Sequence, residues 1–312
     1  MQKKYKIADW LVHGGHQYEF FKTGHSFYCT SPSGDAPDPL SLGRPISKSV
    51  KYVKQKTLQE QRVDMIMVRS PIKKDKYKRL RDKFAFNKPP GIAVMQTTTP
   101  FSPPKWVKCI VWNSKYSMDK YRKDFSWAKS FYIPHGFDPD EFCNLGLERN
   151  NKMLGAGSLY ERRGKLLGYS DWRWVADRLK GSCSLIGHGN TDPECIGSHA
   201  LPELVKIYNE HSVFLNTTIH SAMPRTRAEA MMCGMPIVST SNYGIDRYLK
   251  DGKNCIIADN KRDMLKSVKR ILESPDLQMD LSEKSRATAK RFFHIKDYLA
   301  KWEEVFVAAL RS

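Results

Sequence analysis

The chain has 312 residues, of which 40% are hydrophobic and 27% charged, and its formal net charge is +19. This length suffices for two ordinary domains, and this composition excludes an intrinsically disordered protein. No apolar run approaches the roughly 18–20 residues that span a bilayer, so we expect no stable membrane insertion. The seven cysteines are scattered and include no Cys-x-x-Cys pair. This pattern argues against a zinc site, and we expect a metal-free cytoplasmic protein.

Buried strands alternate with helical patterns in the first half of the chain, which indicates a doubly wound α/β domain. The first apolar run, residues 7–12, is broken by Asp9 and followed by glycines, so it is interpreted as a strand and not as a signal peptide. Gly14 and Gly15 predict a loop before a helix that begins near Tyr18. Further strands are expected at 27–29, 64–68, 92–95 and 109–112, with a loop over 31–45, a basic helix over 73–83 and a helix that starts at 113–114.

A Pro/Gly break with an acidic turn, at residues 133–141, marks the end of this half. A second alternation of strands and helices follows, with strands expected at 152–157, 185–186, 213–215 and from 237 onward. The tail from Phe292 to Leu310 has apolar residues at helical spacing. These patterns predict a first domain over 1–148, a second over 149–290 and a terminal helix over 291–312.

The most informative stretch, residues 220–240, predicts a polar loop, a helix and a buried strand. Pro224 suits the first helical turn, where its missing N–H leaves no hydrogen bond unmade. The free N–H groups and the positive dipole end of such a helix attract an anion, and Arg225 and Arg227 add cations there. Glu229 stands on the first turns, where it either stabilises the helix or accepts hydrogen bonds from a ligand.

This stretch resembles the nucleotide-sugar loop of retaining GT-B glycosyltransferases of the GT4 type. The matching segments are Met-Pro-Arg at 223–225, Glu-Ala-Met at 229–231 and Gly-Met-Pro at 234–236. The family pattern places one Glu eight positions before a second. This chain keeps the second as Glu229 and has Ser221 at the first. The resemblance implies that Glu229 holds the ribose hydroxyls, whereas Ser221 alters the contact to the donor sugar.

Other segments resemble the same family. Residues 131–142 are similar to its hinge, and residues 155–164 are similar to its Gly-Arg-Leu-x-x-x-Lys-Gly turn, with Ser158 at the Arg and Arg163 at the Lys. The resemblance implies an α/β GT-B fold, in which two Rossmann-like doubly wound domains flank a cleft and the C-terminal helix crosses back to the first domain. It also implies a retaining, metal-independent transfer from a nucleotide sugar, UDP-glucose, with no other cofactor.

Such a transfer requires that the charge of the leaving diphosphate is neutralised, that the nucleoside of the donor is bound, and that the acceptor hydroxyl is placed at the anomeric carbon. A guanidinium can bind phosphate oxygens bidentately, which favours the adjacent arginines of the matched turn, although a solvated turn is the alternative. The histidines of the N-terminal loop can orient an acceptor, although loop histidines are often merely exposed. The predicted catalytic residues are Arg163, Glu229, His13 and His16, and the predicted nucleotide-sugar ligands are Gly14, Gly15, Ser158, Arg162, Arg163, Ile196, Pro224, Arg225, Thr226 and Glu229.

Positive charge is concentrated in the first part of the chain. Residues 1–148 contain 26 Lys and Arg against 14 Asp and Glu, or +12, and the remainder contains 26 against 19, or +7. An excess of this size favours a polyanionic partner, with solubility alone as the alternative. Between Lys48 and Lys88 the cations are interleaved with Tyr52, Tyr77 and other aromatic residues that can stack on bases.

The leading hypothesis for the acceptor is a hydroxymethylated pyrimidine in phage DNA. The short length, the basicity and the loop at 13–19 resemble phage-encoded DNA-modifying glycosyltransferases, which implies double-stranded DNA bound by the N-terminal domain in a host cytoplasm. One alternative is transfer to a lipid-linked or cell-surface glycan at an anionic membrane. Another is a non-catalytic nucleic-acid-binding GT-B protein, suggested by Ser158 and Ser221.

Overall fold

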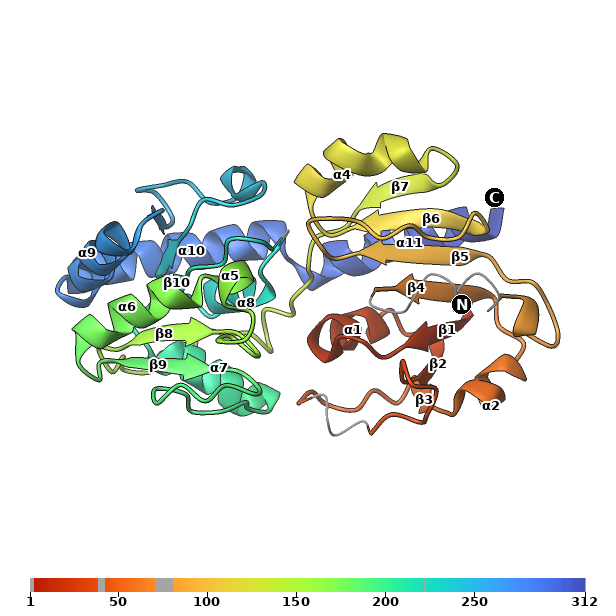
Figure 1. Ribbon diagram of the computed structural model, residues 1–312, viewed down its shortest axis with the longest axis horizontal. Coiled ribbons are helices and arrows are strands. Elements are labelled where there is room, and N and C mark those ends of the chain that lie inside the picture. The colour runs from red at the N-terminus through yellow and green to blue at the C-terminus, as the bar shows by residue number, and fades with distance from the viewer. Residues whose placement is uncertain (1–2, 39–42, 71–80, 222, 312) are drawn as a thin grey trace. The chain divides into compact units, whose positions relative to one another are not determined.

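The computed structural model describes residues 3–38, 43–70, 81–221 and 223–311 of the chain. It contains two compact units (Figure 1): unit 1 comprises residues 1–136 and 296–312, and unit 2 comprises residues 137–295. The sequence patterns placed the boundary after residue 148, whereas the chain passes between the units after Gly136.

Unit 1 is built on a parallel sheet of seven strands, in the order β3-β2-β1-β4-β5-β6-β7. The central strands are mostly apolar, as expected for strands covered on both faces, and the two charged residues buried in them, Asp9 and Arg69, form an ion pair at 2.8 Å. The apolar runs therefore predicted them correctly. The strands are β1 (Lys6–Trp10), β2 (Ser26–Thr30), β3 (Val50–Tyr52), β4 (Met65–Arg69), β5 (Gly91–Met95), β6 (Val107–Trp112) and β7 (Lys129–Tyr132).

The elements of unit 1 correct one expectation and include two that were not predicted. Gly14 and Gly15 do not form a loop: they open helix α1 (Gly14–Phe21), because the side chain of His13 caps its first turn by accepting from the His16 N–H. Strand β3 and helix α2 (Gln55–Gln59) were not predicted, since both are short and α2 is mostly polar. The expected basic helix over 73–83 lies largely outside the described residues. The other elements are η2 (Arg81–Lys83), α4 (Lys115–Tyr121), η3 (Arg122–Phe125) and α11 (Ile295–Arg311).

The C-terminal helix α11 packs on unit 1, as the resemblance implies. The Trp302 ring lies 4.5 Å from the Phe20 ring, centroid to centroid. His25 bridges the chain ends, since its Nδ1 accepts from the Tyr5 N–H at 3.3 Å and its Nε2 lies 2.9 Å from Glu303 Oε1. Aromatic packing and a polar bridge thus attach the last helix to the first sheet.

Unit 2 has a parallel sheet of five strands in the order β12-β11-β10-β8-β9. Its strands are β8 (Met153–Ala156), β9 (Cys183–Ile186), β10 (Val213–Asn216), β11 (Ile237–Ser239) and β12 (Ile256–Ile257). Its helices are α5 (Gly164–Leu167), α6 (Tyr169–Leu179), α7 (Leu201–Glu210), α8 (Arg225–Met232), η4 (Ile245–Arg247), α9 (Lys261–Leu272) and α10 (Pro275–Phe292). The chain adds β9 on one side of β8 and β10 on the other. The sheet therefore has a topological switch point between β8 and β10, where open α/β sheets bind ligands.

Candidate nucleotide-sugar site

The loops that follow β8 and β10 leave the same edge of the sheet of unit 2. The two strands pair in parallel, with Met153 opposite Val213. The first loop carries the predicted ligands Ser158, Arg162 and Arg163, and the second leads to α8. The backbone N–H groups of residues 219 and 220 both donate to the Leu166 carbonyl, at 3.0 and 2.9 Å. The fold thus joins the two predicted ligand segments at the switch point.

The turn after β8 presents two arginines on a fixed backbone. The Arg163 N–H donates to the Leu159 carbonyl at 2.8 Å, and Leu159 adopts a left-handed φ of 52° that closes the turn. Arg162 and Arg163 are exposed. Ser158 accepts from the His188 N–H through its hydroxyl at 3.4 Å, which connects this turn to the loop after β9. Exposed guanidinium groups on such a turn can bind a diphosphate.

Helix α8, which ends the loop that follows β10, begins without a side-chain cap. Pro224 is its N-cap residue and makes no capping hydrogen bond, so the helix starts at Arg225, one position later than expected. Thr226 follows in the first turn and is partly exposed. The N–H groups of this turn and the positive end of the helix dipole form an anion-binding element.

Glu229 is buried and already paired. Its Oε1 accepts from Arg225 Nε at 2.8 Å, and its Oε2 accepts from the Tyr208 hydroxyl at 3.0 Å. The Arg225 guanidinium also lies over the Phe137 ring, 4.6 Å from the centroid. The charge of Arg225, predicted as a cation for the ligand, is therefore balanced within the fold.

Arg227 is not a surface cation, because its side chain is buried and only 1% of the residue is exposed. It donates to Ser239 Oγ at 3.0 Å, to the side-chain oxygens of Asn242 and Asn216 at 3.3 and 3.4 Å, and to the Tyr248 hydroxyl. All four acceptors are neutral side chains, so none of them offsets the charge of the guanidinium. Arg227 therefore adds uncompensated positive charge behind the start of α8.

The loop after β9 carries Ile196, the predicted contact to the base. Ile196 is 46% exposed, and its N–H donates to the Leu185 carbonyl at 2.9 Å. The Gly187 N–H donates to the Gly197 carbonyl at 2.9 Å, which closes the loop at its base. An exposed aliphatic side chain on a closed loop offers an apolar surface that a nucleobase can cover.

The remaining predicted residues belong to unit 1. His13 is exposed and caps α1, whereas His16 is 3% exposed, with its ring 5.5 Å from that of His135 and 6.4 Å from that of Tyr298. Gly14 and Gly15 form the first turn of α1. An approach of these residues to the nucleotide-sugar ligands of unit 2 stays a prediction.

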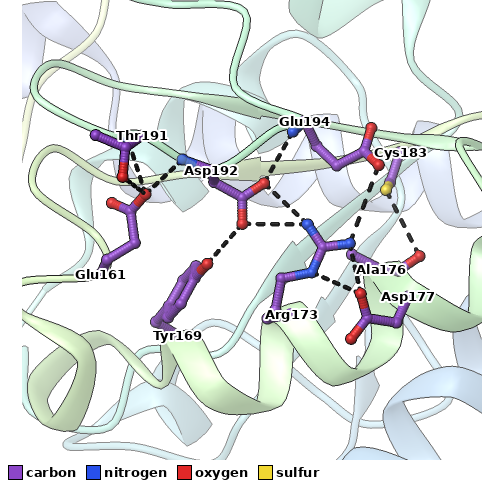
Figure 2. Close-up of polar contacts among 9 residues, drawn as sticks. All are labelled: Glu161, Tyr169, Arg173, Ala176, Asp177, Cys183, Thr191, Asp192 and Glu194. Carbon is purple, nitrogen blue, oxygen red and sulfur yellow. Dashed lines mark hydrogen bonds and ion pairs between the residues drawn. The ribbon is translucent and has the colours of Figure 1, made fainter.

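Two groups beside the predicted ligands were missed by the sequence analysis. One is a polar cluster that connects Glu161 and Asp192 with α6 (Figure 2). The other is His220, whose Nδ1 lies 2.8 Å from the Tyr243 hydroxyl. Glu161 directly precedes Arg162 and His220 directly precedes Ser221, and this proximity was the signal in the sequence that could have found them. Their hydrogen-bond partners come from distant segments.

Comparison with known proteins agrees with this geometry. Residues 152–304 match the family model described as "Glycosyl transferase-like". The chain has the GT-B fold, and just under half of it resembles this glycosyltransferase-like family. A glycosyltransferase from Rickettsia africae has a similar structure, with a TM-score of 0.74 at 14% identity and full coverage of both chains. Anabaena HepE, solved with UDP and glucose, has a TM-score of 0.73 at 12% identity, over 97% of this chain and all of that one.

A curated relative matches part of this GT-B protein. Alpha-monoglucosyldiacylglycerol synthase from Acholeplasma laidlawii is 24% identical over 168 residues, which cover 50% of this chain and 41% of that protein. Among the described residues, no helix is long and apolar enough to cross a membrane. Across the same residues, no group of three or more His, Cys, Asp or Glu side chains is arranged to hold a metal ion.

Proposed function

We propose that the protein transfers a sugar, with glucose as the first donor to test, from UDP to a hydroxyl acceptor with retention of configuration. The observation that carries this proposal is the concentration of anion-binding groups at the switch point of unit 2. Arg162 and Arg163 are exposed on one loop, the uncapped start of α8 lies on the next, and the buried charge of Arg227 stands behind it. HepE, solved with UDP-glucose, supports a uridine nucleotide as the donor carrier.

The proposed reaction uses these groups to stabilise the leaving diphosphate. The bond between the anomeric carbon and the β-phosphate oxygen breaks, and the acceptor oxygen bonds to that carbon on the same face. The acceptor proton passes to the departing phosphate, so UDP leaves and neither a metal nor a protein nucleophile is required. Arg163 and the α8 N–H groups neutralise the charge that develops on the phosphate. Glu229 holds the ribose, and His13 is the histidine exposed enough to orient an acceptor.

We place a lipid-linked acceptor at an anionic membrane surface first. The name of the Acholeplasma relative describes a lipid glycoside, which supports this choice. In unit 1, exposed lysines lie over aromatic rings: Lys105, which precedes β6, lies 3.5 Å from the Trp127 ring centroid, and Lys129 of β7 lies 5.3 Å from that of Phe131. Lysine beside amphipathic aromatic rings suits the headgroup region of an anionic bilayer.

A hydroxymethylated pyrimidine in DNA is the second acceptor. The net charge of +12 in residues 1–148 supports it, since cations that contact phosphates supply the affinity for DNA. On edge strand β3, Lys51 lies 5.7 Å from the Tyr28 ring centroid. None of the relatives named above is described as acting on DNA, so the support for this acceptor is the charge of the chain and the aromatic ring beside Lys51.

The test is a transfer assay with carbon-13-labelled UDP-glucose. The protein is incubated with vesicles of diacylglycerol and phosphatidylglycerol, or with duplex DNA that contains 5-hydroxymethylcytosine or 5-hydroxymethyluracil, and the lipids or nucleosides are weighed by mass spectrometry. Glycosylated lipid supports the first acceptor, and glycosylated nucleoside supports the second. Absence of UDP release with a full panel of UDP sugars and both acceptors would overturn the proposal and favour the non-catalytic alternative.

A pair of arginine variants tests the site itself. Arg163→Ala should lower kcat/KM about 100-fold or more, because it removes a charge-assisted contact to the leaving group. Arg178→Ala is the matched control, since Arg178 lies on α6, stacks on Trp174 and donates to its carbonyl at 3.0 Å. Equal activity of the two variants would remove Arg163 from the site.

A further inference from the structure

The proposed nucleotide ligands lie on separate loops. The arginines follow β8, and Ile196 is carried by the loop that follows β9. A nucleoside diphosphate can use both only if the distance between the loops is fixed, since linked groups bind tightly only when their geometry matches the span. Something must therefore hold the Ile196 loop in register with the arginine turn.

Hydrogen bonds at both ends of the turn make this connection. Near its start the Leu159 N–H donates to the His188 carbonyl at 2.7 Å and the Tyr160 N–H donates to Asn190 Oδ1 at 2.6 Å.

Next to the arginines, Glu161 adds three hydrogen bonds through one carboxylate oxygen. Its Oε1 accepts from the Thr191 N–H at 2.7 Å, from the Asp192 N–H at 2.6 Å and from the Thr191 hydroxyl at 3.3 Å. Glu161 directly precedes Arg162, and Thr191 and Asp192 lie in the loop that ends at Ile196 (Figure 2). Hydrogen bonds from backbone N–H groups to an ionised carboxylate are short and strong, so this contact is a firm tie between the loops.

The ionisation of Glu161 agrees with this arrangement. Desolvation acts to raise the pKa of its carboxyl, but the hydrogen bonds from the backbone outweigh it, and the pKa is lowered from its ordinary value. The carboxylate is therefore charged at neutral pH and keeps both N–H partners.

Asp192 anchors the loop on its other side. Its carboxylate is buried and accepts from the Tyr169 hydroxyl at 2.6 Å and from Arg173 Nη1 at 2.9 Å. The Glu194 N–H also donates to it at 2.9 Å. Figure 2 shows the Asp192 side chain reaching both groups on α6. The loop is thus fixed to helix α6, and the hydrogen bonds of Glu161 fix the arginine turn to the loop.

We infer that Glu161 is a positioning residue that holds the arginine end of the turn against the nucleobase loop, so that one uridine diphosphate engages both. This inference rests on the proposed function. It assigns no chemical step to Glu161, which acts through Arg162, Arg163 and Ile196. Its consequence is that UDP depends on Glu161, whereas a ligand that uses the arginine turn alone does not.

The test compares two probes by calorimetry: UDP, which spans both loops, and inorganic pyrophosphate, which needs the arginines. In Glu161→Ala the Kd for UDP should rise about tenfold or more, and the Kd for pyrophosphate should stay within about twofold. Hydrogen exchange of the Thr191 and Asp192 amides should accelerate, because their acceptor is lost. Glu161→Gln keeps the shape of the side chain and one acceptor oxygen, so its Kd for UDP should rise less than that of Glu161→Ala. If the alanine variant does not fold, the glutamine variant is used for the comparison.

Asp177→Asn is the matched control. Asp177 belongs to the same polar cluster and pairs with Arg173 Nη2 at 2.8 Å, but it lies on α6 with its side chain 58% exposed. It should leave the Kd for UDP unchanged. A wild-type protein that binds neither probe would overturn the proposed function together with the inference. Two results would overturn the inference alone. One is a Kd for UDP that is the same in Glu161→Ala and in the wild type. The other is a Glu161→Ala variant whose Kd values for UDP and for pyrophosphate rise by the same factor.

Discussion

Removal of the Glu229 carboxylate should destabilise unit 2 as well as weaken nucleotide binding. Glu229 and Arg225 are an ion pair whose side chains are 2% and 9% exposed, at 2.8 Å. Breaking a buried pair by removing one partner costs about 3–5 kcal/mol, because the remaining charge loses its counter-ion. The Tyr208 hydroxyl loses its bond to Glu229 too, which costs about 1 kcal/mol. We therefore expect Glu229→Ala to lower the free energy of unfolding by about 5 kcal/mol.

A loss of this size is a large part of the roughly 5–15 kcal/mol that stabilises a domain. The assay is urea unfolding followed by circular dichroism, with hydrogen exchange of peptides from 225–239 to localise the loss to α8 and β11. Tyr208→Phe is the matched control, because it removes one hydrogen bond and keeps the ion pair, and it should cost about 1 kcal/mol.

The result that would refute this reasoning is an unfolding free energy of Glu229→Ala within about 1 kcal/mol of the wild type, since that is the size of a single ordinary hydrogen bond. The ion pair would then contribute nothing beyond its desolvation. Glu229→Gln keeps the side-chain volume and is the variant in which UDP binding can be measured on a folded protein.

Two further predictions concern a glycine and a histidine of unit 2. Gly187 has a φ of +145°, and in Gly187→Ala the new Cβ would lie 2.2 Å from the Gly157 carbonyl oxygen. The substitution should therefore lower the free energy of unfolding by about 2 kcal/mol or more. Gly181→Ala, with positive φ but no atom within 4 Å, should cost about 1 kcal/mol; equal Tm losses would contradict the steric account. Burial lowers the pKa of His211, so the unfolded chain binds its proton first, and stability should fall as pH falls below about 6.5. In urea unfolding from pH 7.5 to 5.5, His211→Gln should show a shallower decline, and parallel curves for the two proteins would contradict this assignment.

Apolar runs predicted most of the strands because a parallel strand buried on both faces needs continuous hydrophobic residues. The runs at 64–68 and 213–215, for example, correspond to β4 and β10. Strand β3 lacks such a run, since it lies at the edge of its sheet and contains the exposed Lys51. Capping decided the start of α1, where the side chains of His13 and Gln17 hold a backbone that the glycine pair alone would leave open.

The sequence predicted where the segments of the candidate site lie in the fold, but not which side chains pair with Arg227 and Glu229. Residues 158–163 and 224–229 follow β8 and β10, as the motifs indicate. The burial of Arg227 could not be predicted, because its acceptors come from β10, β11 and the segments on both sides of η4, and no local pattern encodes them. The partner of Glu229 on α7 is equally distant in sequence. Side-chain pairing of this kind is set by the tertiary fold, whereas backbone position is set by the local pattern.

The most direct test of the nucleotide-sugar site is a crystal structure of the protein with UDP. The account predicts the phosphates between Arg163 and the first turn of α8, the ribose at Glu229 and the uracil against Ile196. Density for UDP away from the loops that follow β8 and β10, or its absence at a UDP concentration that saturates the protein in solution, would contradict the central claim.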